Sequence, residues 1–384
     1  MLVDSIGDSS AGAERFAVGL AGALAPDRYA VTVCATRHAT GRLPATMAAA
    51  GIRVLSLERG TDFKPHAFGR LVRYLRRERV DVLHAHKFGS NVWGTVIGRL
   101  SGVRVIVAHE HSWSYEGDPV RLLLDRYLIG RGASAFVAVS TLDATRMVAV
   151  EKVPAEKVVT IPNAYLPRPR EPVVADLRAE LGLEKDAPLL VTGAILRAEK
   201  ALDVLIDAFA QVVQQLPRVH LVIAGKGPCE AELKRDAAVA GVADRVHFLG
   251  FRSDMDVILE SSDLAVMSSD REGLPLFAIE CMAHRTPLVA TDVGGIRDIL
   301  VENESVLLAP RRDPSALARQ IERALLEPER RDALAAAAHA RLGELTIDRI
   351  ADRFEALYER LLERGAPGVS TPLPVDAQAQ PRAS

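Results

Sequence analysis

The chain has 384 residues, more than one compact core usually organises, so we expect two domains. Its 48 basic and 50 acidic residues nearly cancel, and only 5% of its residues are aromatic. A chain without a net positive field and with few aromatic platforms for base stacking is not expected to bind nucleic acid.

The cysteines and the apolar runs bear on the compartment. Cys34, Cys229 and Cys281 are few and far apart, which is typical of a reducing compartment and suggests no local metal motif. The N-terminus has no basic stretch followed by a long apolar core, so we expect no signal peptide. No apolar run approaches the roughly eighteen residues that a membrane span needs. The prediction is a cytoplasmic protein, and peripheral contact with the inner face of a membrane stays open.

Short β-branched runs alternate with longer amphipathic stretches along the first half. The strands predicted there cover residues 31–35, 54–57, 82–85, 103–108, 135–139 and 158–161, and helices between them include 14–24 and 68–79. Strands that are apolar throughout and separated by helices indicate parallel sheets covered on both faces.

The second half repeats the pattern. Its predicted strands cover residues 189–196, 219–224, 246–249, 264–267, 287–291 and 306–308. Two such series predict an α/β fold of two doubly wound, Rossmann-like domains that face each other across a cleft. The predicted domains are 1–165 and 166–345, followed by a helix within 346–364 that packs back on the first domain and a disordered tail at 365–384.

Two glutamates follow the predicted strand at 264–267. Glu272 and Glu280 have seven residues between them, which include a Gly-Leu-Pro turn. Pro275 has the fixed φ and missing N–H group that suit the first position of a helix. Backbone N–H groups after Gly273 would then point out of a positive helix end, a site for an anion such as phosphate. One of the two carboxylates could then face a sugar while the other accepts hydrogen bonds from vicinal hydroxyls. The alternative is an acidic helix terminus at which Glu272 only serves the dipole.

Cations follow the predicted strand at 189–196. Arg197 and Lys200 would lie at its carboxyl end, where doubly wound sheets bind ligands, and they could grip a diphosphate. The alternative is a solvated helix start. The glycine turn at 225–228 would also let the backbone approach a ligand closely.

The first domain supplies a glycine and two histidines. Gly12 opens the first predicted helix and could approach a phosphate. His109 and His111 follow the strand at 103–108, where a histidine could hydrogen-bond a sugar hydroxyl. Two histidines at this spacing also suggest a metal ligand pair, but the sequence shows no third ligand at a useful distance.

The pair Asp254 and Asp256 could hold a divalent ion, but it stands at a predicted helix start, where aspartate is a favoured capping residue. We interpret the pair as helix capping, and the sequence predicts no metal.

These residues carry a resemblance to a known family. The segment from 268 to 300 reads SSDREGLPLFAIECMAHRTPLVATDVGGIRDIL, and supporting segments read VHLVIAGKGP, RVHFLGF, VTIPNA and AGAERFAVGLAGAL. Over about residues 2 to 363 the chain resembles the retaining glycosyltransferases of the GT-B fold, specifically family 4, glycosyl transferases group 1. The resemblance implies transfer of a sugar from a nucleotide diphosphate donor, UDP or GDP, to an acceptor hydroxyl, with the anomeric configuration kept and with no metal or other cofactor. Polysaccharide, glycolipid or other glycoconjugate synthesis would be the setting.

The resemblance also implies roles for the residues. Glu272 would face the donor sugar, Arg197 and Lys200 would neutralise the diphosphate, and His111, rather than His109, would be the family histidine. Donor binding would further involve Glu280 at the ribose, Gly12 at the diphosphate, and the backbone of Gly273, Leu274, Pro275 and Leu276. With no nucleophile apparent on the opposite face of the sugar, front-face attack is expected.

Three departures from the family pattern are visible. Ala11 precedes Gly12 where the family often has two glycines, and Ala194 and Ile195 occupy the region of a usual arginine, for which Arg197 would substitute. The first strand looks short, at residues 1–3, as if the natural start lay upstream. The first two departures leave open a nucleotide-sugar-binding protein that has lost turnover. A phosphorylase or nucleotide-sugar epimerase of the same fold is the alternative among enzymes.

The acceptor is not readable from the sequence. The basic run at 70–79 (RLVRYLRRER) fits either an anionic membrane surface, and hence a lipid-linked acceptor, or the solvated face of a helix.

Overall fold

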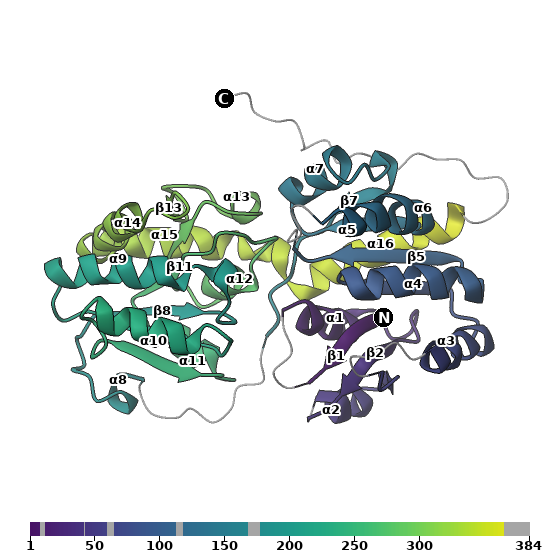
Figure 1. Cartoon of the computed structure of the whole chain (residues 1–384), viewed down its shortest axis with the longest axis horizontal. Helices are drawn as coiled ribbons and strands as arrows, with labels where there is room; N and C mark the ends of the chain where they lie inside the picture. The colour runs from purple at the N-terminus through teal and green to yellow at the C-terminus, as the bar shows by residue number, and fades with distance from the viewer. Residues whose placement is uncertain (8–11, 42, 60–64, 113–117, 168–176, 365–384) are drawn as a thin grey trace. The chain divides into compact units, whose positions relative to one another are not determined.

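The computed structural model describes residues 1–7, 12–41, 43–59, 65–112, 118–167 and 177–364 (Figure 1). The chain forms two compact units. Unit 1 comprises Met1–Ala164 and the segment from Thr346 onward, and unit 2 comprises Tyr165–Leu345. The tail predicted to be disordered, 365–384, lies outside the described residues.

Unit 1 is built on a parallel sheet of seven strands in the order β3-β2-β1-β4-β5-β6-β7. Its strands are β1 (Leu2–Ile6), β2 (Thr32–Ala39), β3 (Arg53–Ser56), β4 (Val82–His86), β5 (Val105–Glu110), β6 (Ala135–Ala138) and β7 (Val158–Thr160). Its helices are α1 (Gly12–Ala23), α2 (Leu43–Ala49), α3 (Pro65–Arg77), α4 (Phe88–Ser101), α5 (Pro119–Leu123), the π-helix η1 (Leu124–Ile129), α6 (Gly130–Gly132), α7 (Thr141–Ala149), the 3-10 turn η2 (Ala155–Lys157) and α16 (Ile347–Arg364). The order turns back between β1 and β4, which is the point where such sheets bind ligands.

Unit 2 repeats this plan with six parallel strands in the order β10-β9-β8-β11-β12-β13. Its strands are β8 (Leu189–Gly193), β9 (His220–Ala224), β10 (Val246–Gly250), β11 (Leu264–Met267), β12 (Leu288–Thr291) and β13 (Leu307–Ala309). Its helices and 3-10 turns are α8 (Leu177–Glu180), η3 (Ala198–Lys200), α9 (Leu202–Gln215), α10 (Glu230–Val239), α11 (Met255–Glu260), α12 (Leu276–Ala283), α13 (Ile296–Ile299), α14 (Pro314–Leu326), α15 (Pro328–Ala340) and η4 (Leu342–Leu345). The predicted fold class, α/β with two doubly wound Rossmann-like domains, is confirmed.

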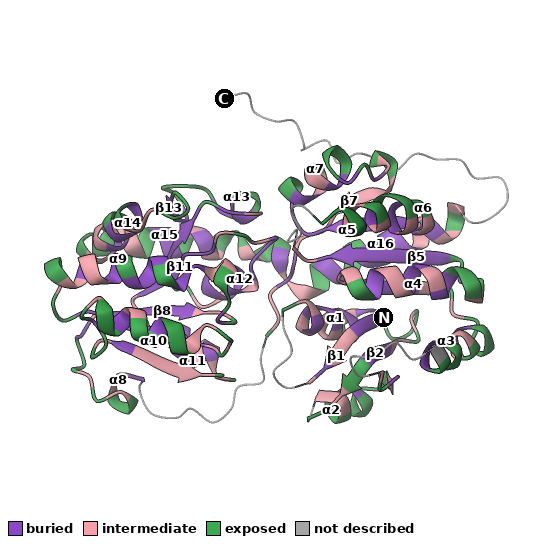
Figure 2. Ribbon diagram, viewed as in Figure 1, coloured by how far each residue is buried: buried purple, intermediate pink, exposed green. Residues whose placement is uncertain are grey.

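The central strands are largely buried because most of their residues are apolar on both faces, whereas β3, β7 and β10 at sheet edges are only half-buried (Figure 2). All four residues of β11 and of β12 are buried. Several predicted bounds were wrong by a few residues. The strand expected at 31–35 runs on to Ala39, the strand expected at 103–108 begins at Val105, and the strand expected at 189–196 ends at Gly193. Strand β1 is longer than residues 1–3 because it pairs with β2 as far as Ile6, with a shift of register between Val3 and Ser5.

Helix α16 returns to unit 1 and packs against α1 and β5. Phe354 is fully buried there, and its ring centroid lies 6.1 Å from that of Phe16 on α1. Glu355 accepts a hydrogen bond from the Ala25 N–H group at 2.8 Å and one from the Arg28 guanidinium at 2.9 Å. The Glu355 carboxylate therefore ties α16 to the chain just after α1. Within the described residues, no helix combines the length and the apolar character needed to cross a membrane.

Candidate donor site

The loop after β11 holds the first predicted glutamate. Its backbone reaches α12 through Pro275, which has φ −72° and ψ 123°. This ψ is extended, so Pro275 is the residue before the helix and not its first residue, as the sequence predicted; the helix begins at Leu276. Within the described residues, Pro275 at the cap position makes no side-chain hydrogen bond to α12, which leaves the first N–H groups of the helix available to a ligand. A helix end of this kind favours an anion.

The structure brings Glu272 and Lys200 together. The Lys200 ammonium donates to Glu272 Oε1 at 2.6 Å, and both side chains are largely buried. The two residues come from the loops after β8 and β11, which are neighbours in the sheet, so the carboxyl ends of these strands place them side by side. The Ser269 hydroxyl donates to the same carboxylate oxygen at 2.7 Å, and the Ser268 hydroxyl donates to the Lys200 carbonyl at 2.9 Å. The ion pair is therefore fixed by side-chain hydrogen bonds from the loop itself.

A third loop supports this arrangement through its backbone. Gly294, after β12, has φ +57°, and a Cβ atom placed on it would lie 2.3 Å from the Glu272 carbonyl oxygen and 2.6 Å from that of Gly273. The N–H group of Gly295 donates to the Gly273 carbonyl at 2.6 Å. Only glycine fits so close an approach at a left-handed φ. Sequence reasoning missed Gly294, although the GG pair of the quoted segment was its signal.

Arg197 does not join the ion pair. It precedes the 3-10 turn that ends at Lys200, and its exposed guanidinium lies 3.9 Å from the Glu199 carboxylate. The predicted glycine turn holds this loop in place: Leu196 donates its N–H to the Lys226 carbonyl at 3.1 Å, and a Cβ on Gly227 would lie 2.3 Å from the Leu196 carbonyl oxygen. Arg197 thus stands on a fixed backbone with a side chain that is free to turn.

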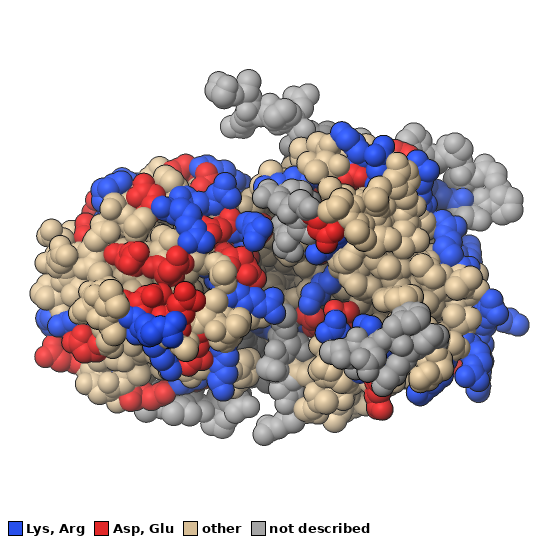
Figure 3. All heavy atoms as spheres, in the orientation of Figure 1, with Lys and Arg blue, Asp and Glu red and all other residues tan. Residues whose placement is uncertain are grey.

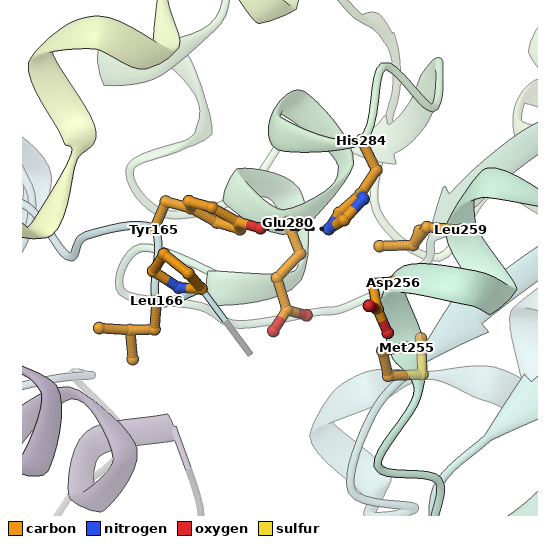
Figure 4. Close-up of a pocket in the computed structure, with 8 residues that line it drawn as sticks. Tyr165, Leu166, Met255, Asp256, Leu259, Glu280 and His284 are labelled. Atoms are coloured by element: carbon orange, nitrogen blue, oxygen red, sulfur yellow. Dashed lines mark hydrogen bonds between the residues drawn. The ribbon is translucent and has the colours of Figure 1, made fainter. Parts of the chain in front are cut away.

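The second predicted glutamate lines a pocket of about 170 Å³ in unit 2. Figure 4 shows Glu280 reaching into it from α12, with Asp256 of α11 on the facing wall. The other lining residues are Tyr165, Leu166, Pro167, Met255, Leu259 and His284. The Tyr165 hydroxyl lies 3.3 Å from His284 Nε2 and closes one side. Two carboxylates on opposite walls are suited to accept hydrogen bonds from neighbouring hydroxyl groups.

The capping interpretation of the two aspartates needs correction. Asp254 does occupy the position before α11, but its carboxylate makes no capping bond and instead accepts two bonds from Arg252, at 2.7 and 2.6 Å. The guanidinium offers charged donors, which bind a carboxylate more strongly than a backbone amide does. Asp256 faces the Glu280 pocket, a position that the sequence gave no way to foresee.

In unit 1, His111 is held at both ring nitrogens. Nδ1 lies 3.2 Å from Asn163 Oδ1, and Nε2 lies 3.1 Å from His86 Nδ1. Burial lowers the pKa of His111 to about 3, although the hydrogen bond with Asn163 acts against this shift. The imidazole is therefore neutral at physiological pH. Asn163 Oδ1 can only accept, so Nδ1–H of His111 donates to it, and Nε2 of His111 accepts a hydrogen bond from Nδ1–H of His86.

His111 is one of four neighbouring rings that we call the histidine stack. His84 and His86 on β4 and His109 on β5 are buried, and the half-buried His111 follows the end of β5. Neighbouring rings lie with centroids 4.1 Å apart for His84 with His86 and for His109 with His111. The Tyr358 hydroxyl on α16 lies 2.7 Å from His84 Nδ1. Burial lowers the pKa of His84, His86 and His109 well below the usual histidine value, so all four rings are neutral.

Three histidines of the stack form a possible metal-ligand set that the sequence did not show, and His111 is not one of them. One nitrogen each from His84, His86 and His109 lies within 4.8 Å of the others. Their rings are nearly parallel for His84 and His109, at 10°, so the nitrogen lone pairs point side by side rather than toward one centre. Zinc would require nitrogens roughly 3.4 Å apart around one point, given bonds of about 2.1 Å. The stack is therefore built as packed neutral rings, and a metal would require the rings to turn.

Gly12 is the first residue of α1 and is exposed, while Ala11 lies outside the described residues. Two residues on, Glu14 is buried and accepts a hydrogen bond from the Lys87 ammonium at 2.7 Å. Sequence reasoning missed this ion pair, which joins the starts of α1 and α4. It places a fixed pair of charges at the carboxyl ends of β1 and β4, beside the point where the strand order reverses.

The sequence of the chain matches two family models. The model of Glycosyltransferase Family 4 matches residues 10–165, and that of Glycosyl transferases group 1 matches residues 173–341. A D-inositol 3-phosphate glycosyltransferase of Thermomonospora curvata is 33% identical over 302 residues, which is 70% of this chain and 70% of that protein. An alpha-D-kanosaminyltransferase of Streptomyces kanamyceticus is 28% identical over 310 residues, which is 75% of this chain and 79% of that protein.

Solved structures share the fold. The crystal structure of the Anabaena protein HepE in complex with UDP-glucose matches with a TM-score of 0.81 at 21% identity, over 94% of this chain and 100% of that one. Sucrose-phosphate synthase from Thermosynechococcus elongatus matches with a TM-score of 0.77 at 23% identity, over 94% and 98% of the two chains. With both family models and a relative matched along most of its length, the chain belongs to the family 4 glycosyltransferases of the GT-B fold.

Proposed function

We propose that this glycosyltransferase moves a sugar from a nucleoside diphosphate donor, UDP or GDP, to an acceptor hydroxyl, with retention of configuration and without a bound metal. The observation that carries the proposal is the contact of Lys200 with Glu272 beside the start of α12. A fixed cation and a helix N-terminus there offer positive charge where a departing diphosphate develops negative charge.

Lys200 can serve the diphosphate without losing Glu272. Its ammonium has three hydrogen atoms to donate, and Glu272 takes one of them in the absence of a ligand. A bound diphosphate can accept the others, which brings Glu272 next to the sugar that the diphosphate carries. Arg197 precedes Lys200 by one turn of 3-10 helix, and its exposed side chain lies 3.9 Å from the Glu199 carboxylate. The guanidinium can leave this loose ion pair and bind a phosphate oxygen of the donor instead.

The Glu280 pocket supports a nucleoside on the far side of the diphosphate. Glu280 and Asp256 face each other across a small space, which suits the two neighbouring hydroxyls of a ribose. Glu280 lies within α12, whose first residues are beside the proposed diphosphate site. Sugar, diphosphate and ribose would then follow the line from Glu272 to Glu280. HepE was crystallised with UDP and with UDP-glucose, which makes UDP the first nucleotide to test.

The retaining reaction we propose is a front-face exchange. The bond between the anomeric carbon and the phosphate oxygen breaks, the acceptor oxygen bonds to the same face of that carbon, and the acceptor proton passes to the departing phosphate oxygen. Lys200 and the α12 terminus stabilise the leaving diphosphate electrostatically. Glu272 accepts a hydrogen bond from the sugar and orients it. His111 contributes only if a ligand replaces Asn163 or His86 at its ring nitrogens, and the neutral ring then serves as a hydrogen-bond partner.

The test separates binding from turnover. Titration calorimetry with UDP, GDP and ADP in the presence of EDTA identifies the nucleotide, and slow hydrolysis of the matching sugar nucleotide measures turnover without a known acceptor. Lys200→Gln should lower the hydrolysis rate about 100-fold, the usual effect of removing one electrostatic donor. Lys185→Gln, an exposed lysine of the same unit, is the matched control and should match the wild type.

Three further readouts sharpen the result. Glu280→Gln should weaken the nucleotide, whereas Glu272→Gln should keep nucleotide binding and lose turnover. Nuclear magnetic resonance of the sugar released first should show the configuration of the donor. Binding that vanishes in EDTA, a released sugar of inverted configuration, or a Lys200→Gln variant that behaves like Lys185→Gln would each overturn a stated part of the proposal. Nucleotide binding without any turnover would identify a nucleotide-sugar-binding protein.

A further inference from the structure

An apolar ridge on unit 1 faces solvent. Helix α5 continues directly into η1, and along this continuous helix Val120, Leu123 and Tyr127 are 64%, 55% and 47% exposed. Their spacing of three and four residues puts them on one face. On the opposite side Ile129 is fully buried. The helix thus carries apolar side chains on its solvent-facing side as well as on its buried side. A surface helix of a globular domain usually has polar side chains on its solvent-facing side.

A groove beside the ridge extends the apolar surface. Its volume is about 460 Å³, and its walls include Val96, Leu100, Tyr127 and Leu128 together with Arg99 and Arg131. Leu100, at the end of α4, is 61% exposed. In Figure 3 the surface of unit 1 over α4 and α5 is largely free of charged side chains, and basic side chains gather along its edge. The ridge and the groove share Tyr127, so they form one continuous apolar area.

Arginines without acidic partners border this area. The guanidinium groups of Arg126 and Arg131 lie 5.0 and 4.9 Å from the centre of the Tyr127 ring. Arg99 donates to the Gly132 carbonyl at 2.9 Å, and Arg76 donates to the Leu100 carbonyl at 2.6 Å. Among the described residues, none of these four arginines lies within ion-pair distance of a carboxylate. The arginines of unit 2 give the contrast, since those at 252, 297 and 312 each bind two carboxylates.

The basic run that the sequence singled out differs from this area. Helix α3 turns Phe68, Leu71 and Leu75 inward, and within the described chain none of its large apolar side chains is exposed. It contributes Arg76 to the border of the apolar area but no apolar contact. Charge alone gives weak, salt-sensitive attraction, whereas charge beside exposed apolar side chains gives attachment at an interface.

We infer that this surface docks on a bilayer that contains anionic phospholipid. We call it the α5 face, and it consists of Leu100, Val120, Leu123, Tyr127, Arg76, Arg99, Arg126 and Arg131. Leucine and valine side chains can enter the acyl boundary, tyrosine suits the headgroup level, and unpaired guanidinium groups bind lipid phosphates. Two acids stand nearby: the Asp118 carboxylate is engaged with the N–H groups of residues 120 and 121 at the start of α5, and Asp125 on η1 is fully buried. The inference does not depend on the transfer reaction.

The experiment is co-flotation of the full chain with phosphatidylcholine vesicles, with and without 30% phosphatidylglycerol, at low and high salt. We expect binding to the anionic vesicles only, weakened by salt. Arg126→Glu with Arg131→Glu should weaken it at least about 25-fold, because each arginine contributes about fivefold at an anionic surface. Val120→Ser with Leu123→Ser should weaken it about tenfold or more, since two exposed apolar side chains leave the interface.

The chain offers a matched control in unit 2. On α10, Arg235 and Val239 are exposed one turn apart, and Val239 is 90% exposed. Arg235→Glu with Val239→Ser changes the same residue types and should leave vesicle binding unchanged. Circular dichroism melting shows that each variant is folded. Tyr127→Trp gives an independent readout, because brominated lipid should quench a tryptophan that lies in the interface.

The outcomes decide the inference. Selective loss in the two α5-face variants, with quenching in Tyr127→Trp, supports it. Equal binding to neutral vesicles, equal loss in the α10 control, no binding by the folded wild type, or absence of quenching would overturn it. Self-association that the Val120→Ser, Leu123→Ser variant abolishes, without vesicle binding, would also overturn it and assign the α5 face to a second copy of the chain.

Discussion

Gly294→Ala should damage the donor site through the backbone alone. The new Cβ would lie 2.3 Å from the Glu272 carbonyl oxygen, where ordinary contacts begin near 3.4 Å. The carbonyl belongs to the backbone and cannot swing aside as a side chain could, so the Glu272 loop has to move by roughly 1 Å. That shift also strains the hydrogen bond from Gly295 to the Gly273 carbonyl.

The magnitude separates into two parts. Alanine in the left-handed region costs about 1 kcal/mol wherever it occurs, which lowers the melting temperature of a unit of this size by about 2–4 °C. Gly241→Ala carries this cost alone, because Gly241 has φ +72° and no atom within 4 Å of its Cβ position. Gly294→Ala adds the displacement of Glu272, and a misplacement of about 1 Å can lower a catalytic rate about 100-fold.

The assay compares the two alanine variants side by side. Circular dichroism melting should show the common loss in both, with a further loss in Gly294→Ala from the strained loop. Hydrolysis of the sugar nucleotide should be normal in Gly241→Ala and about 100-fold slower in Gly294→Ala. If the two variants share the same melting temperature and the same rate, the close approach of Gly294 does not position Glu272, and the reasoning fails.

Two further predictions concern unit 1, where both tryptophans of the chain lie, at 93 and 113, so that tryptophan fluorescence reports on its unfolding alone. Burial holds the pKa of each ring of the histidine stack below the value it has in the unfolded chain. As the pH falls below about 6.5, the unfolded chain therefore takes up protons before the folded one does. The free energy of unfolding should then drop by up to about 1.4 kcal/mol per ring and pH unit. Burial raises the pKa of Glu110 to about 8, so this group acts in the opposite direction and lowers the free energy of unfolding as the pH rises toward 8. The free energy of unfolding measured in urea should therefore have its maximum between pH 6 and 7. Glu110→Gln should remove the decline on the alkaline side of this maximum but not the decline on the acid side. Glu355→Ala should destabilise unit 1 by about 1–3 kcal/mol, because it leaves the Ala25 N–H group without its acceptor and leaves Arg28 with Glu359 alone. Glu363→Ala, on the same helix, is the control, and equal midpoints for the two would contradict the role given to Glu355.

The sequence predicted the donor loop because local patterns determine it. The apolar run at 264–267 and the Gly-Leu-Pro turn place Glu272 at a strand end without any knowledge of the rest of the chain. That Lys200 would reach Glu272 follows from the pairing of β8 with β11, which the doubly wound plan implies. The partner that Arg197 takes could not be predicted, because an exposed guanidinium chooses among nearby acids by small energies.

The histidine stack could not be predicted from the alternation of side chains along single strands, because that alternation does not determine how neighbouring strands are aligned. The chain carries two histidine pairs with one residue between them, and alternation puts each pair on one face of its strand. Whether the pairs meet depends on the register, and the structure pairs His86 with His109. Sequence analysis treated His109 and His111 as an isolated pair and therefore missed both the stack and the hydrogen bond that holds His111.

The proposed site residues of the two units are held by different means. In unit 2, Glu272 is fixed by backbone contacts from Gly294 and by hydroxyl groups, none of which changes its charge near neutral pH. In unit 1, His111 is fixed by a neighbouring imidazole and an amide, and its orientation depends on every ring of the stack staying neutral. A proton added to His86 would leave its Nδ1–H group in place but would put a charge in an apolar interior, and this would lower the free energy of unfolding of unit 1. Because burial holds the pKa of all four rings well below the usual histidine value, acid should act on His111 by unfolding unit 1 rather than by protonating the folded stack, and turnover should be lost together with the tryptophan signal of unit 1.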